Sequence, residues 1–88
     1  MSYHILLNRQ ARKELQRIDR TTEKRINERL EKLSRDPFST RLSNPLTTIS
    51  GVRYSRVGDW RIIYRIDESK AALEVLAIRP RGKGYNDL

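Results

Sequence analysis

The spacing of hydrophobic residues divides the chain into a helical first half and a β-rich second half. Residues 3–7 form a short apolar and aromatic run, and Asn8, a residue that caps helices well, follows it directly. We therefore predict a strand over residues 1–7. From Asn8 onward, apolar residues recur every three or four positions, which is the pattern of an amphipathic helix. These apolar positions are Ala11, Leu15 and Ile18, then Ile26, Leu30 and Leu33.

The helical pattern is interrupted once, which predicts a hairpin of two helices over residues 8–35. The second helix is expected to begin at Thr21 or Thr22. It should end before Asp36-Pro37, because proline disfavours helical backbone at the residue that precedes it. Residues 37–45 mix small polar residues with two prolines, so we expect a connection across the surface.

After residue 45 the period of the pattern changes to two. Three runs rich in β-branched and aromatic residues are separated by a Gly-Asp pair and by residues 67–70. They predict a three-stranded antiparallel meander over residues 46–78. From Arg79 onward, proline and glycine predict a basic tail, residues 79–88, without regular structure. The three runs are Leu46–Val57, Trp60–Ile66 and Ala72–Ile78.

The middle run indicates which face of the meander is buried. Residues 60, 62, 64 and 66 are all hydrophobic and share one face, whereas Arg61, Ile63 and Arg65 share the other. One face should pack on the helices and the other should carry charge. Because the first strand can join the same sheet, we predict one α+β domain, residues 1–88, with the order β-α-α-β-β-β.

Composition gives this small fold a strongly basic character. The 88 residues include 19 Lys and Arg against 11 Asp and Glu, a net charge of +8. A negatively charged partner is therefore expected. The chain has no cysteine, and its longest apolar run, Ile5-Leu6-Leu7, is too short for a membrane span. We expect a soluble, cytoplasmic protein that has no disulfide and no membrane partner.

Candidate chemistry is concentrated in the last third of the chain. The single histidine, His4, lies in a predicted strand, and neither metal-ligand spacing nor a Ser-His-Asp arrangement is present, so no metal or cofactor is expected. Arginines interleaved with tyrosines are suited to contact phosphates and to stack on bases, which favours RNA or DNA over a merely solvated face. These residues are Arg53, Tyr54, Arg56, Arg61, Arg79, Arg81, Lys83 and Tyr85.

The meander should bring several of these residues together. The Gly58-Asp59 turn places the strands of Arg56 and Arg61 side by side, and the tail leaves the third strand nearby. We expect them to converge on one face of the sheet. The helix charges differ, since acids and bases at spacings of three and four are typical of solvated helix faces.

Two segments resemble the RelE toxins of the RelE/ParE superfamily. They are GVRYSRVGDWRIIYR, residues 51–65, and AIRPRGKGY, residues 77–85. The resemblance extends from about Tyr3 to Tyr85. It implies a toxin that enters the ribosomal A site and cuts translated mRNA, held inactive by a RelB-like antitoxin encoded beside it. It also implies a cut by the 2′-hydroxyl of the substrate itself, without a metal or cofactor.

The resemblance also implies roles for individual residues. Arg61, after the aromatic residue of the Gly-Asp-Trp-Arg motif, should stabilise the phosphate. Arg79 and Arg81 match the basic pair after the last strand, and Tyr85 matches a tail tyrosine that stacks on or orients a nucleotide. Arg56 fits a basic position before the turn.

The general base is left open by the sequence. One branch of the family has alternating lysines where this chain has Val52 and Tyr54. Tyr54 and Lys83, whose pKa nearby positive charge would lower, are the alternatives. Unbroken alternation would turn Arg53 toward the helices, and a bulge there would return it to the site.

Two other functions fit the same features. The first is a ParE-like inhibitor of DNA gyrase, which would share the fold and act by protein binding. The second is a noncatalytic RNA-binding module or a decayed toxin, which the altered lysine positions favour. The basic tail that ends at Tyr85 suits nucleotide handling better than a gyrase contact.

Overall fold

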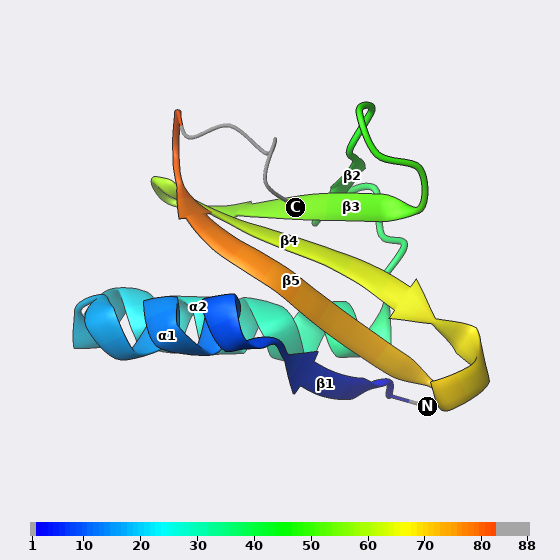
Figure 1. Ribbon diagram of the computed structural model, residues 1–88, viewed down its shortest axis with the longest axis horizontal. Helices are drawn as coiled ribbons and strands as arrows, with labels where there is room; N and C mark the ends of the chain where they lie inside the picture. The colour runs from blue at the N-terminus through cyan, green and yellow to red at the C-terminus, as the bar shows by residue number, and fades with distance from the viewer. Residues whose placement is uncertain (1, 83–88) are drawn as a thin grey trace.

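A mixed β-sheet with both helices packed on one of its faces forms the fold (Figure 1). The computed structural model describes residues 2–82. The strands lie in the order β1-β5-β4-β3-β2, with β1 parallel to β5 and the other neighbours antiparallel. The predicted α+β class and the order of its main elements are confirmed. The elements are β1 (His4–Leu7), α1 (Arg9–Arg17), α2 (Arg20–Arg35), β2 (Asn44–Pro45), β3 (Val52–Val57), β4 (Trp60–Asp67), the 3₁₀ helix η1 (Glu68–Lys70) and β5 (Ala72–Pro80).

Side-chain caps determine where both helices begin. Asn8 precedes α1, and its Oδ1 accepts a hydrogen bond of 2.9 Å from Ala11 N. Asp19 precedes α2, and it accepts hydrogen bonds from the backbone N of Thr22 at 3.0 Å and from the Thr22 hydroxyl at 2.7 Å. The predicted start at Thr21 or Thr22 is therefore wrong, whereas the predicted end before residue 36 is confirmed. Within residues 2–82, neither helix combines the length and the apolar character that crossing a membrane requires.

The strands differ from the prediction in three places. The predicted strand Leu46–Val57 is wrong in its first half, because residues 46–51 form turns and only Val52–Val57 is extended. The predicted connection contains the two-residue strand β2, which pairs with β3. At the other end, β5 continues through Arg79 and Pro80, since these residues pair with the first two residues of β4. The tail therefore begins two residues later than predicted.

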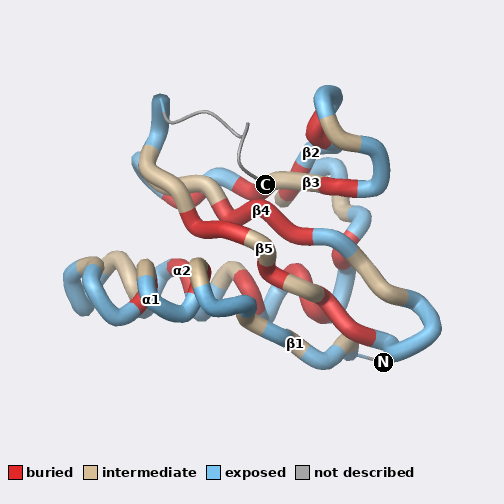
Figure 2. The backbone as a smooth tube through the Cα atoms, viewed as in Figure 1, coloured by how far each residue is buried: buried red, intermediate tan, exposed pale blue. Residues whose placement is uncertain are grey.

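The main core lies between the helices and the sheet, and Figure 2 shows buried segments along β4 and β5. Ile62 and Tyr64 are fully buried on this face, so the predicted alternation along β4 is confirmed. The Tyr64 hydroxyl donates a hydrogen bond of 2.6 Å to Pro37 O and lies 2.8 Å from Ser43 Oγ, which satisfies its polar atom inside the core. The remaining buried members are Ala11, Leu15, Ile26, Leu30, Leu33, Val57, Leu73, Val75 and Ile78.

We call the face of the sheet opposite the helices the open face. A second, smaller apolar cluster lies on it, where residues 46–51 fold back over the strands. Leu46 and Val52 meet Ile63 and Ala77 there. The open face therefore carries buried apolar side chains as well as the predicted charges, and the turn segment forms a wall along it.

The cap of α2 makes the stability of the fold depend on pH. Hydrogen bonds from Thr22 hold the pKa of Asp19 below its ordinary value of 3.8. A carboxyl with a lowered folded-state pKa stabilises the fold above its unfolded pKa, and this contribution is lost as the pH falls through the folded pKa. We expect the free energy of unfolding of the wild type to exceed that of Asp19→Asn at neutral pH, and this difference to shrink as the pH falls below 3.8.

Urea unfolding followed by circular dichroism from about pH 6 to about pH 2 measures this difference. Asn caps helices as well as Asp but does not titrate, so the comparison isolates Asp19 from Asp67, whose pKa a Ser69 hydrogen bond also lowers. A difference that stays constant over the whole range would contradict the assignment.

Candidate nucleic-acid interface

Three arginines lie directly opposite one another across three neighbouring strands. Arg56 of β3 pairs with Arg61 of β4, and Arg61 pairs with Arg79 of β5. We call these residues the arginine row. Opposed residues in an antiparallel pair have Cβ atoms about 5 Å apart, so like charges at such positions weaken a sheet. An anion with several oxygens, in contrast, is bound better by guanidinium groups held this close together.

A β-bulge at Leu76 places Arg79 in the row. Side chains alternate along a strand and Val75 faces the helices, so unbroken alternation would turn Arg79 toward the helices as well. The ladder instead skips Leu76, because residues 75 and 77 pair with two consecutive residues of β4. Beyond the bulge, Ile78 enters the main core and Arg79 lies opposite Arg61 on the open face.

Two hollows adjoin the row on the open face. Arg61 and Tyr54 line a pocket of about 260 Å³ together with residues 45–48, and the Arg61 guanidinium lies 6.0 Å from the centre of the Tyr54 ring. Arg79 lines a groove of about 630 Å³ between the start of α1 and residues 49–52. A cation beside an aromatic ring, next to further cations, is the arrangement that phosphate contact with base stacking requires.

Arg81 is held close to the same end of the sheet. Its backbone N donates a hydrogen bond of 2.6 Å to Asp59 O in the turn between β3 and β4, and the residue is exposed. Of the residues singled out from the sequence, the structure thus brings Arg56, Arg61 and Arg79 into one row and ties Arg81 to the adjoining turn. The predicted site residues Lys83 and Tyr85 lie outside the described residues.

Arg53 lies on the other face of the sheet. β3 pairs with β4 in unbroken register, so no bulge returns Arg53 to the open face. Its Nε donates to Ser43 Oγ at 3.0 Å, its Nη2 donates to Ser43 O at 3.2 Å, and its guanidinium lies 5.8 Å from the centre of the Phe38 ring. These contacts attach the connection between α2 and β2 to the sheet, which gives Arg53 a structural role.

Two arginines of α2 approach the sheet near the arginine row from the helix side, and no sequence pattern distinguishes them from the other helix charges. Arg29 Nη1 donates hydrogen bonds of 2.8 Å both to Ser55 Oγ and to Arg56 O, so it holds the backbone of the row. The Arg25 guanidinium passes close under Gly58, where a Cβ would lie 3.3 Å from its Nη1. Gly58 has φ +59°, so a larger residue would be strained by its backbone as well as by this contact.

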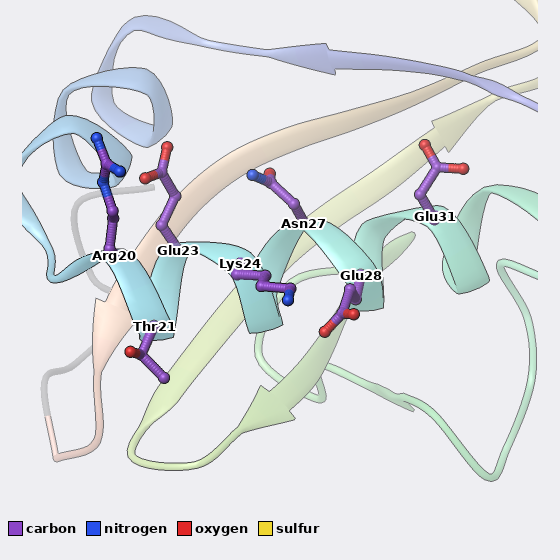
Figure 3. Close-up of a pocket in the computed structure, with 7 residues that line it drawn as sticks. All are labelled: Arg20, Thr21, Glu23, Lys24, Asn27, Glu28 and Glu31. Carbon is purple, nitrogen blue, oxygen red and sulfur yellow. The ribbon is translucent and has the colours of Figure 1, made fainter.

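A hollow on the outer surface of α2 has different chemistry (Figure 3). It measures about 630 Å³, and all of its lining residues come from this one helix. Its lining mixes acids and bases, and Glu31 pairs with Arg35 at 3.7 Å one turn later. It lies on the helix side of the molecule, whereas the arginine row lies on the open face. Among residues 2–82, no group of three His, Asp or Glu side chains is placed to hold a metal ion.

Comparison with known proteins gives both a family and a fold. A family model described as the ParE toxin of the type II toxin–antitoxin system parDE matches residues 5–85. The toxin–antitoxin complex RelBE2 from Mycobacterium tuberculosis has a chain with 26% identity and a TM-score of 0.78, covering 92% of this chain and 100% of that chain. No curated protein sequence matches.

Two further solved structures share the fold at lower identity. The archaeal RelE–RelB complex from Pyrococcus horikoshii matches with 24% identity and a TM-score of 0.79, over 96% of this chain and 100% of the other. The isolated RelE toxin from Escherichia coli matches with 15% identity and a TM-score of 0.82, over 98% of this chain and 92% of the other.

We expect Arg61→Gln to weaken RNA binding by removing a phosphate contact from the centre of the row. Each lost contact to a single strand should also lower the slope of log Kd against log salt by about 0.7. Fluorescence anisotropy with a short labelled RNA at several salt concentrations measures both quantities. Arg35→Gln is the matched control, because it removes the same charge from an exposed, ion-paired position on α2. Equal losses in the two variants would show that only net charge matters.

Proposed function

The chain belongs to the ParE toxin family of type II toxin–antitoxin systems, and from that premise we propose that it is a ribosome-dependent endoribonuclease that cuts mRNA and thereby inhibits translation. The arginine row carries this proposal. Three opposed guanidinium groups suit a transition state that places two negative charges on phosphorus oxygens. The fold shared with RelE structures supports the same reaction class.

The proposed reaction uses a hydroxyl group of the substrate as the nucleophile. The 2′-oxygen attacks the adjacent phosphorus and loses its proton to a base. The bond from phosphorus to the 5′-oxygen then breaks, leaving a 2′,3′-cyclic phosphate and a 5′-hydroxyl that takes up a proton. Apart from these two proton transfers, every bond that forms or breaks lies within the RNA, so the protein has to position the phosphate, stabilise charge and move protons.

The residues of the open face fit these tasks. Arg61, at the centre of the row, would grip the non-bridging oxygens, flanked by Arg56 and Arg79. Arg81, beside the turn, would donate a hydrogen bond to the leaving 5′-oxygen. Of the two candidates for the base, Tyr54 lies among the described residues, and its ring lies next to the Arg61 guanidinium. The other base candidate, Lys83, and the proposed stacking residue Tyr85 complete the assignment.

The proposed partners follow from the family and from the charge. The solved relatives include toxins bound to RelB antitoxins, and we propose a RelB-like antitoxin for this chain. Its net charge of +8 and the exposed Arg56 and Arg81 suit an acidic partner segment that neutralises the site. In the active state the same charges would face the mRNA and the ribosomal RNA around it.

Arg61→Gln tests the site directly. On ribosomes programmed with a defined mRNA, the wild type should cut the message, and the single-turnover rate constant of Arg61→Gln should fall by about 100-fold or more. Arg35→Gln should cleave like the wild type, and circular dichroism should show that both variants are folded. Cleavage by Arg61→Gln at the wild-type rate would refute the role of the row.

A chemical change in the substrate tests the nucleophile. A message with a single 2′-deoxy nucleotide on the 5′ side of the scissile phosphate should bind but remain uncut at that position. The uncut message would be seen by primer extension on the programmed ribosomes. Cleavage of the deoxy message at an unchanged rate would show that another nucleophile, such as water, attacks the phosphorus.

Inhibition of DNA gyrase is the second candidate function, because the matching family model is that of ParE toxins. Gyrase inhibition predicts that gyrase loses its supercoiling activity while mRNA stays intact. A gyrase assay and the ribosome assay, run side by side, distinguish this function from mRNA cleavage. A noncatalytic RNA-binding module would bind RNA but would neither inhibit gyrase nor cut mRNA.

A further inference from the structure

We infer that Asn8 and Gln10, at the start of α1, are positioning residues that hold the β5 bulge and thereby keep Arg79 in the arginine row. The catalytic part of this inference rests on the proposed function, whereas its structural part does not. Both residues are distant in sequence from the arginines, and Asn8 also serves as the cap of the first helix. Hydrogen bonds from Asn8 and Gln10 to β5 connect that cap to the site.

Where the pairing of β1 ends, the start of α1 forms hydrogen bonds with the edge of β5. Parallel pairing of β1 with β5 stops at Leu7 and Val75, one residue before the bulge. The Asn8 backbone N donates a hydrogen bond of 3.1 Å to Val75 O, and Asn8 Nδ2 donates one of 2.6 Å to Leu76 O, the carbonyl of the bulged residue. Gln10 Oε1 then accepts a hydrogen bond of 3.2 Å from Ile78 N.

These contacts replace the strand that β5 lacks beyond the bulge. The Leu76 carbonyl and the Ile78 amide are polar backbone groups at the sheet edge, and polar side chains of α1 satisfy both. Asn8 uses its two amide atoms for separate tasks, since its Oδ1 caps α1 while its Nδ2 binds the bulge. The start of α1 and the bulge are therefore fixed relative to each other by one side chain.

The position of the bulge decides which way Arg79 points. A shift of pairing by one residue moves every side chain beyond it to the other face of a sheet. Only Ala77 and Ile78 lie between the bulge and Arg79. A bulge that is less firmly held at Leu76 would therefore also displace the Arg79 side chain. A displacement of about 1 Å can lower the rate of a positioned reaction by about 100-fold. Asn8 and Gln10 should therefore affect the chemical step more than substrate binding.

Asn8→Ser separates the two tasks of the residue. Serine also caps helices, so α1 keeps its cap, but the amide donor to the bulge carbonyl is lost. Asn27→Ser is the matched control, because it makes the same change at an exposed position on α2. Gln10→Met removes the acceptor for Ile78 N and keeps a side chain of similar length.

Hydrogen exchange tests the structural part without any activity. In Asn8→Ser and Gln10→Met, the amides of residues 76–79 should exchange at least about tenfold faster, while those of Ile62 and Leu73 keep their rates. Asn27→Ser should match the wild type throughout. Unchanged exchange at residues 76–79, or a uniform increase across the sheet, would overturn the inference whatever the chain does to mRNA.

A double-mutant cycle on programmed ribosomes tests the catalytic part. Asn8→Ser should lower the single-turnover rate constant by about tenfold with less than about threefold change in ribosome affinity, and it should have no further effect in Arg79→Gln. An equal loss in both backgrounds would mean that Asn8 does not act through Arg79, and would overturn the inference. If the wild type does not cut mRNA, the proposed function fails, and the exchange experiment still decides the structural part.

Discussion

The pairing of β5 with β4 is the constraint on which the rest of the structure depends. Its bulge at Leu76 lets one strand supply Val75 and Ile78 to the helix-side core and Arg79 to the opposite face. In a regular strand that kept Val75 in the core, Ile78 would lie on the open face and Arg79 would face the helices. Both changes are unfavourable, because a buried arginine is costly and an exposed isoleucine loses its packing. The bulge therefore separates the part of the sheet that stabilises the fold from the part that carries the arginine row.

Much of the fold could be predicted from the sequence, because its local signals agree. The apolar spacing of the helices, the cap at Asn8 and the alternation along β4 all indicate the observed elements. The bulge could not be predicted, since the run Ala72–Ile78 is apolar at almost every position and alternation therefore carries no information there. Leu46 and Ile49 gave the pattern of a strand for a related reason, as they pack on the open face from a turn segment.

Most residues of the candidate site could be predicted from the sequence, whereas only part of their geometry could. Arg56 and Arg61 flank a recognisable turn, so their pairing follows from the sequence. Arg53 shows the limit, because the contacts with Ser43 and Phe38 that assign it to the helix side come from a connection without regular structure. Arg29 is indistinguishable in sequence from solvated helix charges, yet its hydrogen bond to Arg56 O supports the row.

We propose that the open face, and not the helix face, meets the scissile phosphate. A cryo-electron-microscopy structure of the wild-type chain on a ribosome programmed with a 2′-deoxy, uncleavable message would test it most directly. We expect the scissile phosphate to lie within about 3 Å of the guanidinium groups of the arginine row, with both helices turned away from the message. A phosphate against α1 or α2, or a chain that leaves the A site empty, would contradict it.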